Sequence, residues 1–181
     1  MAKELVWIDL EMTGLNPQIH KIIEIATIIT DSELNIIAKG PDLVINATDD
    51  ELNKMNTYVR DMHTKSGLID EVKKSSLTIR DAEIETLEFI NKHIKAKNKP
   101  PVCGNSIGTD RAFLVEHMPT VAKHCHYRNI DVSSIKQIYE AWYPNHDRFY
   151  KKNHHRALDD IKESIAELKY YRSSIFIKDD K

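Results

Sequence analysis

The fold of this chain follows from one stretch near its start, Leu5-Val6-Trp7-Ile8-Asp9-Leu10-Glu11-Met12. Successive residues of a β-strand point to opposite faces, so the apolar residues at positions 5–8 make both faces of the strand apolar. A strand with two apolar faces is typical of the middle of a sheet. We therefore predict that this strand is central and covered on both sides.

The same strand ends in two carboxylates, Asp9 and Glu11, which share one face while Leu10 and Met12 keep the other face apolar. Residues i and i+2 of a strand lie roughly 6.6 Å apart, at about 3.3 Å per residue. Carboxylates side by side at the end of a buried strand repel and are costly to desolvate. A divalent cation relieves both costs, and two cations about 3.5–4 Å apart fit this spacing. The stretch alone leaves two interpretations open, a metal site and a solvated strand end.

Composition and charge exclude several classes of protein. A chain of 181 residues suits one domain, or at most two small ones, and its ordinary aliphatic and charged content argues against disorder. The formal net charge of −2 leaves no global basic field for holding long nucleic acid. Cys103 and Cys125 form no C-x-x-C pattern, and we see no secretory segment and no apolar run of ~20 residues. The sequence therefore predicts a cytoplasmic protein with reduced thiols and no membrane span.

Turns and strands alternate after the acidic strand end. Residues 21–29 are rich in β-branched side chains and predict a second strand. Two short strands are expected near residues 35–38 and 43–45, separated by Gly40-Pro41. Successive strands joined by short turns indicate an antiparallel meander.

Leu15 is an apolar residue within the turn Thr13-Gly14-Leu15-Asn16-Pro17, next to the two carboxylates. In one interpretation it is a plug that fills the core. In the other it is a wedge against a substrate base.

Helical patterns follow from residue 49 onwards. We expect helices over residues 49–58 and 66–74, with His63 in a polar stretch. A third helix starts with an S/T-x-x-D/E sequence at 78–81 and buries one apolar face. That face is made by Ile84, Leu87, Ile90 and Ile94.

Asp110 follows a short strand at residues 100–103 and a glycine-containing turn, and it opens a helix. Such an acid either complements the helix N-terminus or serves a functional site. A last strand at 127–132 and a helix from Ser133 to about Trp142 come next.

The second informative stretch is His154-His155-Arg156-Ala157-Leu158-Asp159-Asp160, which leads into an apolar helical stripe. His155 and Asp160 are five residues apart, about 140° around the axis of a regular helix. We therefore expect His155 on the loop before the helix and Asp160 in its early turns. A general base and a metal ligand suit these places, and an equal alternative is two helix-start acids beside surface histidines.

Together these motifs resemble the DEDD superfamily of 3′-to-5′ exonucleases, in its histidine-containing branch, and within it the oligoribonuclease family. The acidic pair on a strand, the lone aspartate after a glycine-containing turn and the H-x-x-x-x-D spacing match the superfamily. The closer match runs nearly end to end and is carried by residues 7–15, 103–108, 126–128 and 167–172.

The resemblance implies an α/β, ribonuclease-H-like fold: a mixed five-stranded sheet with an antiparallel meander, flanked by helices. It implies a single exonuclease domain over residues 1–181. The implied activity is 3′-to-5′ cleavage of very short RNA, with dinucleotides preferred, to 5′-mononucleotides. Two divalent cations, Mg²⁺ or Mn²⁺, and assembly as a homodimer are also implied.

The resemblance also assigns roles to residues. The acids that match metal ligands are Asp9, Glu11, Asp110 and Asp160, and His155 matches the general base. The residues that match substrate contacts are Leu15, Tyr58, His63, Ser106, Tyr127, Arg128 and Ser133. Among these, Leu15 would separate two bases, whereas Tyr127 and Arg128 would reach the active site of a partner subunit.

The chain departs from the family pattern at two positions. Tyr58 stands where many members carry Trp, and it offers a smaller stacking face. His154 stands where a small polar residue is expected, and the H-x-x-x-x-D spacing selects His155 as the base.

An exonuclease acting on longer single-stranded RNA or DNA is the alternative function. That activity favours a basic groove, and the net charge of −2 argues against it. A nucleic-acid-binding module is disfavoured because the four acids and the histidine expected for the chemistry are all present. A purely structural domain is disfavoured because it would need three separate coincidences among the acids.

Overall fold

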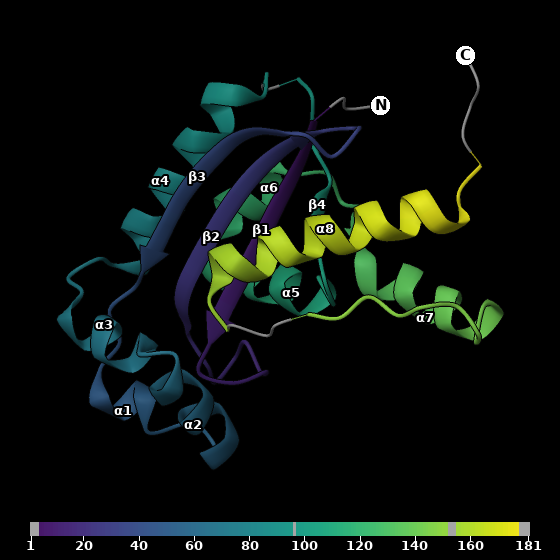
Figure 1. Cartoon of the computed structure of the whole chain (residues 1–181). Helices are drawn as coiled ribbons and strands as arrows, with labels where there is room; N and C mark the ends of the chain where they lie inside the picture. The colour runs from purple at the N-terminus through teal and green to yellow at the C-terminus, as the bar shows by residue number, and fades with distance from the viewer. Residues whose placement is uncertain (1–3, 96, 152–154, 178–181) are drawn as a thin grey trace.

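The computed structural model describes residues 4–95, 97–151 and 155–177, and a five-stranded sheet forms its centre (Figure 1). The strands are β1 (Glu4–Met12), β2 (Ile22–Asp31), β3 (Ile36–Val44), β4 (Val102–Gly104) and β5 (Asn129–Asp131). Their order is β3-β2-β1-β4-β5, in which β1–β2 and β2–β3 are antiparallel and β1–β4 and β4–β5 are parallel. The predicted mixed sheet, its antiparallel meander and the central position of β1 are confirmed.

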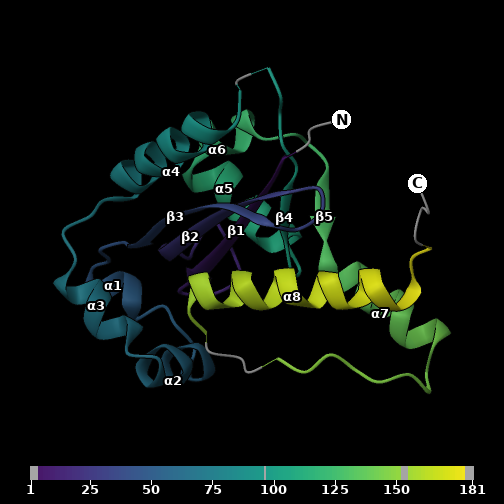
Figure 2. The ribbon, with the colours of Figure 1, turned by 45° about the horizontal axis from the view of Figure 1, so that its top comes forward.

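Helices cover both faces of the sheet and lie at one end of it (Figures 1 and 2). They are α1 (Asp49–Leu52), α2 (Thr57–Lys65), α3 (Leu68–Lys74), α4 (Ile79–His93), α5 (Gly108–His117), α6 (Pro119–His124), α7 (Val132–Trp142) and α8 (Ala157–Ile175). Figure 2 shows α8 along one face and α4, α5 and α6 on the opposite face, with α1, α2 and α3 grouped at one end. Within the described ranges, no helix is long and apolar enough to cross a membrane.

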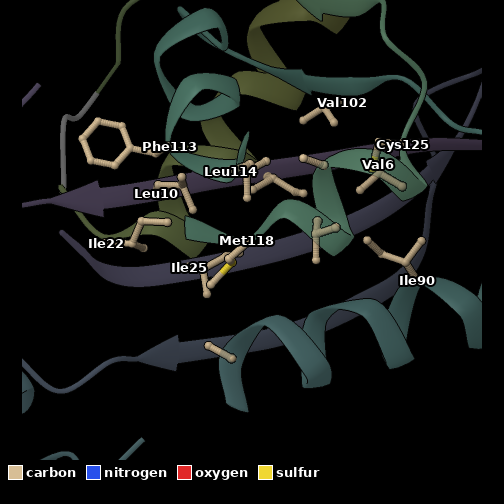
Figure 3. Packing of buried hydrophobic residues seen from close by; sticks show 14 of the residues in the cluster. Val6, Leu10, Ile22, Ile25, Ile90, Val102, Phe113, Leu114, Met118 and Cys125 are labelled. Atoms are coloured by element: carbon tan, nitrogen blue, oxygen red, sulfur yellow. The ribbon is translucent and has the colours of Figure 1, made fainter. Parts of the chain in front are cut away.

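The sheet divides the core into two main layers. On one side, Val6 and Leu10 of β1 pack with residues of α4, α5 and α6 such as Ile90 (Figure 3). On the other side, Leu5 and Trp7 pack with α7 and α8. The odd-numbered face of β1 therefore looks towards α8, and the carboxylates that continue this face point the same way.

β3 is one strand where the sequence predicted two short strands, so that prediction is wrong. A Cβ atom at Gly40 would lie 2.5 Å from Cε1 of Phe89, so this glycine allows α4 to pack closely on the strand and marks no turn. Pro41 is tolerated because β3 lies at the edge of the sheet, and the β2–β3 register shifts between Ala26 and Ile28.

The helix predicted over residues 49–58 is in fact two helices, and His63 lies inside the second. α1 ends at Leu52, and Asn56 begins α2 by accepting the N–H of Val59 at 2.9 Å. His63 is therefore part of a helix and is fully buried. The prediction that it lies in a polar stretch between two helices is wrong.

Three smaller predictions are also corrected. Ile84 is exposed, because the buried face of α4 is centred on Ala82 and Ile90. The last strand, predicted over residues 127–132, is limited to β5. α6 was not predicted, although Pro119 stands at its start, a position that proline favours.

Candidate active site

Three carboxylates meet at the end of β1. Asp9 and Glu11 lie on the face of β1 that looks towards α8, and Asp160 lies near the start of α8. One carboxylate oxygen from each of the three lies within 4.8 Å of the other two. Carboxylate oxygens are the ligands that hard divalent cations prefer, so these side chains fit a cation such as Mg²⁺ or Mn²⁺.

Asp110 approaches the same strand end from α5. It is buried in the first turn of that helix, and its Oδ1 accepts the backbone N–H of Leu10, between the two strand acids, at 3.1 Å. The structure therefore brings all four predicted acids to one place, although Asp110 is not among the three whose oxygens meet. Its position also complements the N-terminus of α5, and its role as a metal ligand stays a prediction.

Burial and the charges of neighbouring acids raise the pKa values of Asp9, Glu11 and Asp110. Burial is the main cause for Asp9, whose pKa lies well above its usual range, and the charge of Asp110 raises it further. Burial also raises the pKa of Glu11 to about 8 and that of Asp110 to about 7. A bound divalent cation would offset both causes, so the electrostatics fit a metal site.

His155 lies on the loop before α8, as the sequence predicts. Its side chain is half-buried, and its φ of 53° falls in the left-handed region that few non-glycine residues adopt. Asp160 follows in the early turns of α8, so the predicted division between loop and helix is confirmed. His154, the other histidine considered, lies outside the described residues.

Two residues that sequence reasoning missed hold this loop. Glu24 of β2 is fully buried and lies opposite Glu11 in the β1–β2 register. One of its carboxylate oxygens accepts the Nε–H of Arg156 at 2.9 Å, and the other accepts the backbone N–H of Ala157 at 3.0 Å. Arg156 also donates to both carboxylate oxygens of Glu71 in α3, at 3.0 and 2.8 Å. No spacing in the sequence connects these residues.

Lys151 is a further cation close to the acids, and sequence reasoning missed it too. Its Nζ lies 2.9 Å from the carboxylate of Glu167 in α8, which is fully buried. Asn105 donates to the same carboxylate at 3.1 Å. The positive charge of Lys151 lowers the pKa of Asp9, which places it within electrostatic reach of the site. Glu167 lies in residues 167–172, one of the stretches that carry the resemblance to the family. That resemblance was the one indication in the sequence that this part of the chain serves the site.

A pocket of about 650 Å³ adjoins the carboxylates and contains two of the predicted substrate residues. Leu15 and Tyr58 both line it together with Glu11, and these two residues are 76% and 73% exposed. The interpretation of Leu15 as a core plug is therefore wrong. Gly14 leaves room for the ring of His20 in this turn, because a Cβ atom there would lie 2.4 Å from its Nε2.

His63 of α2 contacts the end of β1 beside this pocket. Its Nε2 donates to the carbonyl oxygen of Met12 at 2.9 Å, and its Nδ1 lies 3.9 Å from Oε2 of Glu11. Burial lowers the pKa of His63, which keeps its ring neutral near pH 7. Its Nδ1 has no hydrogen-bond partner among the described residues. His63 is therefore next to a predicted metal ligand.

Ser106 and Ser133 lie together before α5 and in the first turn of α7. The N–H of Ser106 donates to the hydroxyl of Ser133 at 2.7 Å and to Oδ1 of Asp131 at 3.0 Å. The hydroxyl of Ser133 in turn donates to Oδ1 of Asn105 at 3.1 Å. Because Asn105 also contacts Glu167, the two serines belong to the network that holds Lys151.

Five of the predicted substrate residues do not line this pocket: His63, Ser106, Ser133, Tyr127 and Arg128. Tyr127 and Arg128 also lie outside the contacts described above for the other three. Tyr127 is 73% exposed and lines a different hollow, beside Lys99 and Arg111. The guanidinium carbon of Arg128 lies 5.4 Å from the centre of the Tyr127 ring. Neither residue is among those that line the pocket next to Glu11.

The sequence is similar to one family along nearly its whole length. A family model described as Exonuclease matches residues 6–168. A protein named oligoribonuclease from Vibrio parahaemolyticus serotype O3:K6 is 52% identical over 175 residues, which cover 96% of each chain. Oligoribonuclease from Haemophilus influenzae is 52% identical over 171 residues, which cover 94% of this chain and 93% of the relative. Oligoribonuclease from Pseudoalteromonas atlantica is 51% identical over 176 residues, which cover 97% of each chain.

The fold is also that of solved exonucleases with much lower identity. Exonuclease I of E. coli, in complex with a 5cy-dT13 oligonucleotide, matches with a TM-score of 0.73 at 15% identity over 97% of this chain. Exonuclease I from Methylocaldum szegediense matches with a TM-score of 0.69 at 18% identity over 95% of this chain. The chain spans 41% of the length of each of these two proteins. The likeness concerns the fold alone, and it confirms the predicted ribonuclease-H-like architecture.

Proposed function

This chain belongs to the oligoribonuclease family of exonucleases, and on that basis we propose that it removes nucleotides from the 3′ end of very short RNA. Dinucleotides are its preferred substrates and 5′-mononucleotides are its products. The observation that carries this proposal is the meeting of three carboxylates beside a pocket lined by the exposed Leu15 and Tyr58. Groups for hydrolysis and groups for holding bases therefore adjoin one another, as cleavage of a short oligonucleotide requires.

The four acids are the residues that would hold two divalent cations, Mg²⁺ or Mn²⁺. Asp9, Glu11 and Asp160 offer oxygens close to one another, and Asp110 adds a fourth carboxylate whose charge acts on Asp9. When bound, such cations lower the pKa of water and stabilise negative charge on the leaving oxygen. A set of ligands made only of carboxylates favours Mg²⁺ or Mn²⁺ over softer metals.

His155 is the general base of the proposed reaction. Its ring takes a proton from the water molecule that attacks the terminal phosphodiester. The bond between phosphorus and the 3′ oxygen of the preceding nucleotide breaks, that oxygen takes a proton from solvent, and His155 afterwards returns its proton to solvent. A mononucleotide carrying a 5′ phosphate is released, and the remaining RNA ends in a 3′ hydroxyl.

Leu15 and Tyr58 hold the bases of the substrate by packing against them. Both side chains are apolar or aromatic, both are exposed, and both line the pocket next to Glu11. Ser106 and Ser133 offer polar groups for the rest of the substrate, and His63 supports the site from beside Glu11.

A homodimer completes the site in this proposal. Tyr127 and Arg128 of a second copy would close over the 5′ side of the substrate, where the Arg128 guanidinium suits a phosphate. Their exposure, away from the pocket of their own chain, supports a role in another subunit.

A single exonuclease domain over residues 1–181 and a cytoplasmic location are part of the same proposal. The family model extends over residues 6–168, most of the chain. Cys103 and Cys125 are both free and buried, which suits a reducing compartment.

The proposal is tested by measuring cleavage rates for RNA of two, three and seven nucleotides in the presence of Mn²⁺. We expect the native protein to cleave the dinucleotide most efficiently, and Arg128→Ala to lose most on that substrate. Lys169→Ala, which removes an exposed cation of α8, serves as the control for a general change in charge. Equal efficiency on all three lengths, or full activity of a demonstrated monomer, would favour the exonuclease that acts on longer strands.

A further inference from the structure

Arg156, the residue that follows the proposed general base, belongs to a partly buried ion network. We propose that Arg156 is a positioning residue for His155, because it fixes the backbone that carries the histidine ring. This inference rests on the proposed function, in which His155 accepts a proton during RNA cleavage.

The guanidinium of Arg156 is held by two different elements. Its Nε donates to Oε1 of Glu24 in β2 at 2.9 Å, and one terminal nitrogen lies 2.8 Å from the same oxygen. Both terminal nitrogens also donate to the two oxygens of Glu71 in α3, at 3.0 and 2.8 Å. Two carboxylates thus engage the planar fork of one guanidinium, which is a geometry that lysine cannot reproduce.

Glu24 uses its second oxygen to hold the start of α8. Oε2 accepts the N–H of Ala157, the first residue of that helix, at 3.0 Å. Arg156 occupies the position before the helix and makes no side-chain cap of its own, so a carboxylate from β2 satisfies a donor that would otherwise be unpaired. One carboxylate therefore fixes the side chain of Arg156 and the backbone immediately after it.

His155 has a backbone conformation that needs such support. Its φ is 53°, and a non-glycine residue persists in this region when the surrounding structure holds it there. Arg156 follows with φ −133° and ψ 126°, an extended conformation from which α8 begins. In Figure 2 the first turn of α8 is the end of that helix nearest α3, the element that carries Glu71.

The ion network also explains why a cationic side chain is needed at position 156. Glu24 is fully buried and lies opposite Glu11, another buried carboxylate. Without Arg156, Glu24 would be left as a buried charge with no counter-ion, and its hold on Ala157 would weaken. The loop would then relax, and the ring of His155 would leave the position from which it takes the proton.

A double-mutant cycle tests whether Arg156 acts through His155. The single-turnover rate of dinucleotide cleavage is measured for the native protein, Arg156→Gln, His155→Ala and the double variant. We expect Arg156→Gln to lower the rate roughly 10- to 100-fold, as a misplaced catalytic group does, with KM changed by less than about two-fold. In the His155→Ala background the same substitution should cause no further loss. A purely structural role would multiply the two losses, and that result would overturn the proposal.

Two controls separate this role from other effects. Arg172→Gln removes a cation near the opposite end of α8, where it pairs with Glu33, and should leave the rate within about two-fold of native. Binding of Mn²⁺, measured by calorimetry, should be at least as tight in Arg156→Gln as in the native protein, because a nearby positive charge has been removed. Weaker Mn²⁺ binding would mean that Arg156 acts through the acids, and would overturn the proposal.

A second variant covers the case in which Arg156→Gln does not fold. The Glu71 side chain is 46% exposed, so Glu71→Lys repels Arg156 and leaves Glu24 in place. We expect a loss of about ten-fold that again disappears in the His155→Ala background. Losses that multiply would overturn the positioning role while native cleavage still supports the proposed function. A native protein that cleaves no short RNA would overturn both.

Discussion

Glu11 and Glu24 lie directly opposite each other on β1 and β2, and their electrostatic surroundings differ. Glu24 forms an ion pair with Arg156 at 2.8 Å, whereas Glu11 faces the neutral ring of His63 at 3.9 Å. Like charges on directly opposed strand residues destabilise a sheet. Glu11 is therefore the member of the pair whose charge calls for a bound cation, and without one its raised pKa of about 8 keeps its carboxyl protonated near neutral pH.

Replacing any one of the four acids by its amide should abolish most activity and stabilise the metal-free protein. The substitutions are Asp9→Asn, Glu11→Gln, Asp110→Asn and Asp160→Asn. We expect turnover to fall roughly 100-fold or more, because charge stabilisation in the transition state is lost. The melting temperature in EDTA should rise by about 2–4 °C for each kcal/mol of repulsion removed.

Asp159→Asn is the matched control for these four substitutions. Asp159 precedes Asp160 in α8, and its side chain pairs with Lys162 at 2.8 Å on the exposed side of the helix. We expect little change in turnover or in the melting temperature. Near-native turnover of any one of the four amide variants, at moderate Mn²⁺, would remove that residue from the site.

The metal-free protein should lose stability as the pH rises from about 4.5 to about 8. Burial, followed by the charge of Asp160, raises the pKa of Glu11 from 4.5 to about 8. In this window the folded state keeps a proton that the unfolded state has released, so the stabilisation is complete below pH 4.5 and disappears through pH 8. The raised pKa of Asp110 acts in the same direction, whereas the lowered pKa of His63 opposes it below about pH 6.5.

Thermal melting in EDTA from pH 5 to pH 8 measures this dependence. Glu11→Gln should flatten the decline between about pH 7 and pH 8, where the titration of His63 contributes little. Excess Mn²⁺ at pH 8 should restore the lost stability, because a cation that binds only the folded state stabilises it. If stability in EDTA rises with pH instead, the carboxyls of Glu11 and Asp110 ionise in the folded protein without a cost in folding free energy, and the prediction is wrong.

The two neighbouring histidines should differ in their effect on turnover. His155→Ala should lower the single-turnover rate roughly 10²- to 10⁴-fold, the usual contribution of a general base. His154→Ala should lower it far less, because the H-x-x-x-x-D spacing selects His155. Both rates are measured on one dinucleotide at saturating enzyme. A reversed order would transfer the base role to His154.

Tyr58 should contribute to substrate binding through stacking. Tyr58→Ala should lower kcat/KM for a dinucleotide. The loss, expressed as a free energy, should be about 1–3 kcal/mol, the usual value for one base stacked on an aromatic ring. Tyr58→Trp should keep or improve it, because the indole ring offers a larger face. Trp142→Ala, at an exposed aromatic residue of α7 outside the pocket, is the control. An unchanged kcat/KM for Tyr58→Ala would exclude stacking on this residue.

The parts of the fold and site that could be predicted from the sequence are those set by local periodicity. The change from apolar to acidic residues along one strand face predicted both the central position of β1 and the direction of Asp9 and Glu11. The five-residue spacing of His155 and Asp160 predicted a loop and a helix, because a regular helix would separate the two. The roles of these residues remain predictions.

The parts that could not be predicted depend on partners far away in the sequence. In the sequence, Glu24 is an ordinary polar residue within a β-branched strand. Its importance shows only in the structure, where it contacts Arg156, 132 residues later. Gly40 resembles a turn residue because the sequence does not show the Phe89 ring that packs on it. His63 resembles a surface residue for the same reason, since its contact with Met12 joins two distant segments.

The three carboxylates that meet at the end of β1 come from opposite ends of the chain, Asp9 and Glu11 from the first strand and Asp160 from α8. During synthesis, β1 can pair with β2, and β2 with β3, as soon as these strands leave the ribosome, because the contacts are close in sequence. The contact between β1 and α8 must wait until nearly the whole chain has emerged. The cluster of carboxylates can therefore assemble only after α8 has been made and has docked, so unfinished copies of the protein lack it.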